Sequence, residues 1–170
     1  GRVAIVVDSA ASLPADTAER EGLFVVPMQL AVGDETYLDG RDLKPTAFYR
    51  MLRDMTDLPK SAAPSPASFL ETFRSAAKGA AAIFCLTVSS RFSSSHDSAR
   101  TAVREAEGAV QHTEIAVVDS GSAAGGEGLI ALEAWRAAQL GESLDGVVAA
   151  AEAVIPKVSL LAYVDTLHYL

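Results

Sequence analysis

Residues 81–95, AAIFCLTVSSRFSSS, decide the fold that this sequence predicts. The apolar run from Ala81 to Val88 is followed directly by the polar run from Ser89 to Ser95. A short, continuous apolar run is typical of a strand that is covered on both faces of a parallel sheet. Serine residues at its exit favour the start of a helix, which we expect from His96 to Gly108. The stretch therefore predicts one strand–loop–helix unit.

The same unit recurs elsewhere in the chain. Val3 to Val7 is a β-branched run that ends at Asp8-Ser9, and Ile115 to Val118 ends at Asp119-Ser120. Further helices are predicted from about 12–14 to 21, at 45–55 and 66–78, from the 121–128 loop to 140, and at 144–155. Short buried strands that alternate with helices predict an α/β layered domain with a largely parallel sheet flanked by helices.

Three further segments are predicted to be extended or irregular. Residues 23–32 form an apolar extended segment interrupted by Pro27, and residues 36–38 are expected to pair back as a short strand. Residues 57–66, DLPKSAAPSP, contain three prolines and are predicted to lack regular structure. Residues 158–164 are predicted to form a last strand.

Composition limits the classes of function. The 170-residue chain is 49% hydrophobic, which allows a real core, and its formal net charge is −8. That charge, without any run of Lys or Arg, disfavours nucleic acid and anionic membrane surfaces. No apolar stretch is long enough to span a membrane and no signal-peptide pattern opens the chain, so we expect a cytoplasmic location. The single cysteine, Cys85, is predicted to be a buried strand residue.

Hydroxyl groups follow three of the predicted strands, at Asp8-Ser9, Ser89 to Ser95 and Asp119 to Ser122. In parallel sheets ligands collect beyond the carboxyl ends of the strands. The serine run can hold a carboxylate or phosphate, or it can simply cap a helix, and capping is the favoured explanation on local sequence alone. Ser65 before Pro66 is expected to be a helix N-cap. Ser61 has no such role and is the better ligand candidate in its loop.

Other kinds of site are not predicted. VDSGSAAGGEG, residues 118–128, lacks the G-x-G-x-x-G order of a dinucleotide site, and tight turning and close helix packing explain its glycines. The histidines show no metal-ligand spacing, and His96 is expected to be an exposed helix residue. A triad of Ser93, His96 and Asp119 can be imagined but needs geometry to support it. We therefore predict no catalytic residue, metal or cofactor.

Six segments together resemble the DegV family of bacterial fatty-acid-binding proteins, in order and spacing over essentially the whole chain. They are VVDSAASLP (6–14), PMQLAVGDETYLDGRDL (27–43), KSAAPSP (60–66), SSRFSSSHDSA (89–99), VVDSGSAAGGEG (117–128) and LLAYVDTLHYL (160–170). The resemblance implies a two-domain α/β protein that binds a long-chain fatty acid between its domains. It also implies that the protein presents the acyl carboxylate to a fatty-acid kinase and is not itself the enzyme.

The resemblance implies which residues hold the carboxylate. The two hydroxyls that the family uses fall on Ser61 and Ser93. Ser94, the next residue of the serine run, is included in the expected site, although it stands where the family has a glycine. If that glycine needs a positive φ, Ser94 must be strained or the loop must differ. Ala62 and Ala63 replace two polar residues of the family's loop.

The resemblance also implies a domain division. Residues 1–156 are expected to form the N-terminal α/β domain, and residues 157–170 a strand and the start of a helix that lead into a missing second domain. Without that domain we expect the chain to self-associate and to bind fatty acid weakly. The competing hypothesis is an α/β enzyme that acts on a small phosphorylated or carboxylated metabolite at the same strand ends.

Overall fold

The computed structural model describes residues 1–106, 110 and 113–163. Its strands are β1 (Val3–Asp8), β2 (Phe24–Val26), β3 (Gln29–Val32), β4 (Glu35–Leu38), β5 (Lys60–Ala62), β6 (Ala82–Thr87) and β7 (Glu114–Asp119). Its α-helices are α1 (Ala15–Glu21), α2 (Pro45–Leu52), α3 (Pro66–Ala77), α4 (Ser95–Ala106), α5 (Ala124–Gln139) and α6 (Leu144–Val154). Two 3₁₀ turns are η1 (Ser9–Ala11) and η2 (Ile155–Lys157). Most predicted elements are thus confirmed to within a few residues.

The main sheet has four strands in the order β2-β1-β6-β7, and every neighbouring pair is parallel. Because all four strands run the same way, their carboxyl ends lie at one edge, where β1 ends at Asp8, β6 at Thr87 and β7 at Asp119. The predicted α/β fold with a largely parallel sheet is confirmed.

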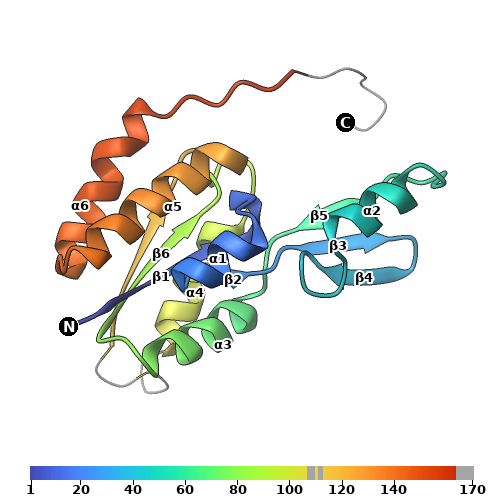
Figure 1. Ribbon diagram of the computed structural model, residues 1–170. Helices are drawn as coiled ribbons and strands as arrows, with labels where there is room; N and C mark the ends of the chain where they lie inside the picture. Colours follow the sequence, from blue (N-terminus) through green and yellow to red (C-terminus); the bar gives the residue numbers. More distant parts are fainter. Residues whose placement is uncertain (107–109, 111–112, 164–170) are drawn as a thin grey trace.

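Helices cover both faces of this sheet (Figure 1). One face packs against α1, α5 and α6, and the other against α3 and α4. Alternate residues of β1 point to opposite faces, so Val3, Ile5 and Val7 join the first core while Ala4 and Val6 join the second. Both faces of the sheet are buried against apolar side chains, which explains why the strands are continuous apolar runs without polar alternation.

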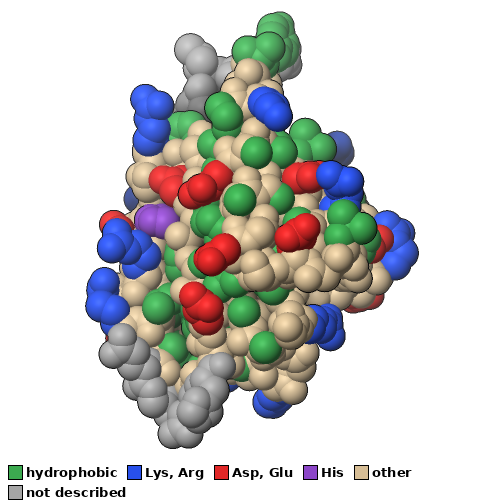
Figure 2. Space-filling view, turned by 90° about the vertical axis from the view of Figure 1, so that its left-hand side faces the viewer, with side chains coloured by type: hydrophobic (Ala, Val, Ile, Leu, Met, Phe, Trp, Pro, Cys, Tyr) green, Lys and Arg blue, Asp and Glu red, His purple; other side chains and the backbone are tan. Residues whose placement is uncertain are grey.

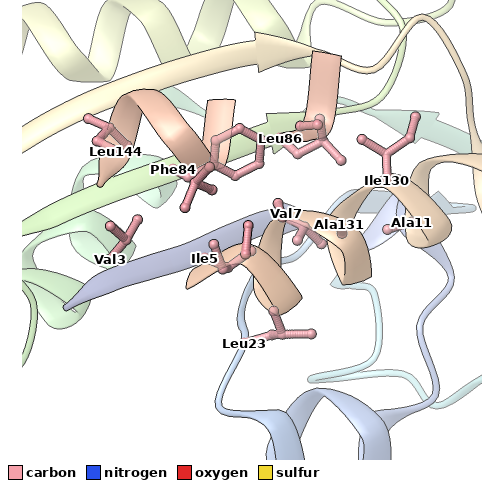
Figure 3. Close-up of a cluster of buried hydrophobic side chains, with 14 of the residues drawn as sticks. Val3, Ile5, Val7, Ala11, Leu23, Phe84, Leu86, Ile130, Ala131 and Leu144 are labelled. Atoms are coloured by element: carbon pink, nitrogen blue, oxygen red, sulfur yellow. The ribbon is translucent and has the colours of Figure 1, made fainter. Parts of the chain in front are cut away.

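The first core is the larger one, and Figure 3 shows it between the sheet and α5 and α6. Phe84 and Leu86 of β6 lie fully buried there against Ile130 and Ala131 of α5. Burying one such large apolar side chain contributes roughly 1.5–3 kcal/mol. This packing fixes the first turns of α5 against the carboxyl edge of the sheet.

A second, antiparallel sheet has the strand order β4-β3-β5. Two residues separate the end of β2 from the start of β3, so this sheet lies beyond the carboxyl edge of the main sheet (Figure 1). The prediction that residues 57–66 lack regular structure is wrong for β5, which pairs with β3. The prolines did not prevent this strand because Pro59 and Pro64 flank it and leave its own N–H groups available.

The glycine-rich start of α5 is more helical than predicted, since the helix begins at Ala124 within the expected loop. A side chain at Gly128 would meet the Ala11 carbonyl oxygen at 2.9 Å, and one at Gly126 would collide with the Ser122 hydroxyl. Gly128 therefore permits the close approach of α5 to η1, Gly126 leaves room for Ser122, and the packing explanation of the motif is confirmed.

The predicted strand over residues 158–164 is wrong for residues 158–163, which have no regular secondary structure. Val158 packs against the first core, but Leu161 and Tyr163 are 94% and 91% exposed. In Figure 1 this segment leaves α6 without lying alongside either sheet. A strand needs a partner for its backbone groups, and apolar residues alone do not supply one. Residues 164–170, which carry the expected helix start, lie outside the described residues, as do 107–109 at the predicted end of α4.

No helix among the described residues has the length and apolar character needed to cross a membrane. On the face of the molecule shown in Figure 2, acidic side chains lie among apolar ones, and Lys and Arg lie mainly towards the borders. This distribution is consistent with the acidic net charge of the chain.

Candidate functional site

The carboxyl edge of the main sheet brings the three hydroxyl-rich strand exits together, as predicted. The β6–α4 connection, residues 88–94, is called the serine loop here. Its Ser89 N–H donates to the Ser122 carbonyl at 2.8 Å, and the Ser120 N–H donates to the Thr87 carbonyl at 3.1 Å. These bonds join the end of β6 and the start of the serine loop to the loop that follows β7. Ser89 and Ser120 are almost fully buried, so polar side chains lie beneath the surface at this edge of the sheet.

Asp8, the last residue of β1, lies at the same edge and is fully buried. Its Oδ2 accepts a hydrogen bond from the Val88 N–H at 2.9 Å and another from the Ser95 hydroxyl at 2.6 Å. Short bonds to a carboxylate are among the stronger hydrogen bonds in proteins. Asp8 therefore ties β1 to both ends of the serine loop.

Glu127 is a second buried carboxyl at the same edge, in the first turn of α5. The pKa of Glu127 is raised to about 11, with burial as the largest cause and the neighbouring charge of Asp8 as the second. The group is therefore a neutral acid at neutral pH. Neither of its oxygens has a partner of good hydrogen-bond geometry within the described residues, nor does Asp8 Oδ1.

Asp119 anchors the turn after β7. Its carboxylate accepts from the Gly121 N–H at 2.9 Å and from the Ser90 N–H at 3.2 Å. Partial burial acts to raise the pKa of Asp119, but hydrogen bonds from Ser90 and Gly121 outweigh it, and the pKa is lowered. Asp119 is thus a charged carboxylate that is already engaged by the serine loop.

Ser93 lies in the serine loop and is half-buried. Its N–H donates to the Ser89 carbonyl at 3.2 Å, and its Oγ accepts from the Ser95 N–H at 3.1 Å. Within the described part of the chain, no acceptor receives the proton of its hydroxyl. Ser93 therefore caps the start of α4 and still has a donor to offer to a ligand. The two alternative roles of this serine are compatible.

Ser94 is exposed, and its carbonyl accepts from the Ser98 N–H at 3.0 Å in the first turn of α4. The non-glycine residues with positive φ in the described structure are Ser12 and Ala124. Ser94 therefore has no positive φ, and of the two alternatives given for it, strain or a different loop, strain is not found.

Ser61 lies in the middle of β5, opposite Leu30 of β3, and its side chain is exposed. In the described residues, no hydrogen bond connects it to Ser93 or Ser94. Ser61 lies in the small sheet, which begins beyond the carboxyl edge, whereas Ser93 lies on that edge. The structure therefore places the two serines in different sheets, with no hydrogen bond between them among the described residues.

The imagined triad is not assembled. Within the described residues, His96 Nδ1 has the Thr87 hydroxyl as its hydrogen-bond partner at 3.2 Å, and Ser93 and Asp119 have the other partners given above. The prediction that His96 is an exposed helix residue is wrong, because the bond to buried Thr87 holds the ring half-buried.

Cys85 is fully buried as predicted, and burial raises the pKa of its thiol well above the usual range. Among the described residues, no three His, Cys, Asp or Glu side chains form a metal-binding group.

Sequence reasoning missed the pair of Asp8 and Glu127. A signal for Glu127 was present, since it shares a helical face with Ile130, Ala131 and Ala134 at spacings of three, four and seven. A charged residue at the head of an apolar helical stripe indicates a buried carboxyl. Its proximity to Asp8, more than a hundred residues away, had no local signal.

Comparison with known proteins gives a consistent result. A model of the DegV family, described as uncharacterised proteins, matches residues 2–170. A DegV domain-containing protein of Streptomyces coelicolor is 38% identical over 169 residues, which are 99% of this chain and 58% of the relative.

Two solved structures are similar in fold and sequence. A DegV family protein from Thermus thermophilus, described for its fatty-acid binding, is 30% identical with a TM-score of 0.80, over 92% of this chain and 54% of that chain. The B3 protein of a fatty acid kinase from Streptococcus pneumoniae, solved with linoleic acid, is 27% identical with a TM-score of 0.77. The match covers 92% of this chain and 55% of that chain. The chain spans about half the length of the proteins that it matches.

Proposed function

This chain belongs to the DegV family, and from that premise we propose that it is part of a fatty-acid-binding carrier, which holds a long-chain acyl group and presents its carboxylate to a fatty-acid kinase. In this proposal the ligand head group binds at the carboxyl edge of the main sheet. Ser93 donates a hydrogen bond to the carboxylate, Ser61 contributes a second one from the small sheet, and Ser94 follows Ser93 in the serine loop as the third residue of the site.

The observation that carries the proposal is the state of the Ser93 hydroxyl. Its oxygen is held by the Ser95 N–H, which fixes the side chain, while its proton has no acceptor in the described structure. A donor that is oriented before the ligand arrives loses little entropy on binding. The start of α4 adds the favourable field of a helix N-terminus for an anion.

The acyl tail supplies most of the expected affinity. Each buried CH₂ group contributes roughly 0.8 kcal/mol, so a long chain needs an apolar surface more than it needs polar contacts. A few placed donors are then enough to orient the carboxylate. Two serine hydroxyls are such donors.

The proposed partner is a kinase that transfers phosphate to the bound carboxylate. In this arrangement the carrier leaves the carboxylate accessible while the tail stays away from water, and the chemistry takes place on the partner. The structures of relatives described as fatty-acid binding, one of them a fatty acid kinase B protein, support this division of roles.

The test is to purify the complete protein, extract it with organic solvent and identify the released molecules by mass spectrometry. We expect about one long-chain fatty acid per molecule, and an unrelated protein purified in parallel shows the background. A protein that carries no lipid, and instead turns over a phosphorylated or carboxylated metabolite, would contradict the carrier and support the enzyme.

A further inference from the structure

The serine loop is held at both ends by one carboxylate. Asp8 Oδ2 accepts from Val88, the first residue of the loop, and from Ser95, the residue directly after it. Ser95 in turn donates its N–H to the oxygen of Ser93. The orientation of the Ser93 hydroxyl therefore depends on Asp8 through a chain of two hydrogen bonds.

Asp8 is itself in an unusual environment. Its Oδ1 and both oxygens of Glu127 are buried without a hydrogen-bond partner in the described structure. Glu127 is close to Asp8 because the first turn of α5 packs on η1, the turn that follows Asp8. The absence of a side chain at Gly128 allows this approach, since a Cβ there would lie 2.9 Å from the Ala11 carbonyl.

Two adjacent buried carboxylates cannot both be charged without compensation. The ion pairs of the described residues join other side chains and leave Asp8 and Glu127 without a cation. A proton on Glu127 that is donated to Asp8 Oδ1 satisfies two unpartnered atoms and removes one charge. A buried network is stable only when its members are satisfied in this way.

We propose that Asp8 and Glu127 form a buried acid pair with one shared proton, and that this pair is the positioning device for the serine loop and for Ser93. The proposal deepens the proposed function, on which its ligand-binding part rests. With one charge in place of two, the pair also reduces repulsion of an incoming carboxylate. Asp8 and Glu127 are positioning residues and do not touch the ligand.

Other ionisable groups surround the pair on each packed element. Cys85 of β6 is a neutral thiol, Asp119 at the end of β7 is a charged carboxylate, and His96 of α4 lies near Asp119. The charge of Asp119 further favours the protonated form of Glu127. The surroundings therefore add negative charge, which strengthens the need for the shared proton.

The first test needs no ligand. Glutamate is labelled with ¹³C at the side-chain carboxyl, and the Glu127 signal is identified by its loss in Glu127→Gln. We expect this carbon to show the chemical shift of a protonated acid at pH 7, while exposed glutamates show carboxylate shifts. A Glu127 signal that titrates between pH 4 and 5 would overturn the acid pair.

The positioning role is tested by amide hydrogen exchange of Ser93 and Ser95. Asp8→Asn and Ser95→Ala should both increase exchange at these two amides, while the amides of α6 serve as the internal control for global stability. Ser95→Ala removes only one hydroxyl, so it keeps the test valid if Asp8→Asn folds poorly. Unchanged protection of the two amides in a folded Ser95→Ala variant would overturn the positioning role.

Oleate binding to the complete protein tests whether the Asp8–Ser95 hydrogen bond affects ligand binding through Ser93. We expect Ser95→Ala to weaken oleate binding about tenfold in the natural background and to have almost no further effect in a Ser93→Ala background, because the two act through one contact. Equal losses in both backgrounds would contradict action through Ser93. If the natural protein does not bind oleate, the proposed function fails, while the carbon signal and amide exchange still decide the acid pair.

Discussion

The hydroxyl of Ser93 combines two roles that local sequence could not separate. Its oxygen receives the Ser95 N–H at the start of α4, which is capping, and its proton stays available. A neutral hydroxyl can do both at once because it carries one donor and two lone pairs. The capping role, which local sequence favoured, therefore does not exclude the ligand role.

Ser93→Ala in the complete protein should weaken fatty-acid binding by about 1.5–3 kcal/mol, since a hydrogen bond to a charged group is lost. A calorimetric or fluorescence titration with oleate measures the change. Ser75→Ala, which changes an exposed serine of α3, is the matched control and should bind normally. Unchanged affinity in Ser93→Ala would falsify the assignment.

Ser61→Ala should have a smaller effect on binding. The exposed hydroxyl lies on a strand whose backbone is paired to β3, so little ordering is needed when a ligand arrives. We expect a loss of about 1 kcal/mol in the same titration. The idea is contradicted if the variant changes the melting temperature and leaves the affinity for oleate unaltered.

Glu127 makes the stability of the protein depend on pH. Its pKa is about 11 in the folded state, against 4.5 as the ordinary value. The folded state therefore keeps a proton that the unfolded state releases, and the stabilising contribution, complete below pH 4.5, is lost as the pH rises from there towards 11.

Glu127→Gln removes this dependence because glutamine is neutral at every pH. Between pH 5 and 9 the variant should gain stability relative to the natural protein, by up to about 1.4 kcal/mol for each pH unit. Urea unfolding at several pH values gives the difference. If the two proteins differ in their free energy of unfolding by the same amount at every pH, the raised pKa of Glu127 is contradicted.

At the scale of elements, α3 shows how a local signal sets a boundary. Ser65 precedes Pro66, and its Oγ accepts from the Ser68 N–H at 3.2 Å, which confirms the predicted N-cap. The same proline-rich stretch contains β5, which no local signal indicated. A cap needs only neighbouring residues, whereas a short strand depends on a partner strand.

Ser65→Ala should lower the free energy of unfolding by about 1 kcal/mol, because the first turn of α3 loses an acceptor. Thermal or urea denaturation followed by circular dichroism measures this change. Ser75→Ala in the same helix should be close to neutral, since its side chain is exposed. If Ser65→Ala and Ser75→Ala change the free energy of unfolding equally, the Ser65 cap does not stabilise α3.

At the scale of the whole molecule, several large apolar side chains face solvent. Phe92 of the serine loop and Tyr49 of α2 are 69% and 63% exposed, and Leu161 and Tyr163 are exposed near the end of the described residues. Exposed apolar surface of this kind favours association when it is contiguous.

We therefore expect the 170-residue chain to self-associate and to bind oleate more weakly than the complete protein. Light scattering coupled to size-exclusion chromatography at tens of micromolar protein measures the first property, and the titration measures the second. Leu161→Ser with Tyr163→Ser should shift the chain towards the monomer. A monomeric chain that binds oleate as tightly as the complete protein would contradict both the assigned ligand site and the assigned association surface.

The fold could be predicted largely because its signals are local. Continuous apolar runs marked β1, β6 and β7, and Pro45 and Ser65-Pro66 marked the starts of α2 and α3. The segment after α6 was predicted as a strand and is irregular through residue 163, since strand formation depends on a pairing partner that an apolar run does not reveal.

The sequence by itself determined the parallel α/β architecture, the buried state of Cys85 and the meeting of three strand exits at one edge. It did so because periodicity, caps and strand direction act over a few residues and then follow general rules of sheet topology. Only the tertiary structure decided that Asp8 holds both ends of the serine loop, that Glu127 lies beside it and that His96 binds Thr87. The first two relations depend on packing between segments that are 80 or more residues apart in the sequence. In the second of them, a glycine in α5 sets how closely two elements approach.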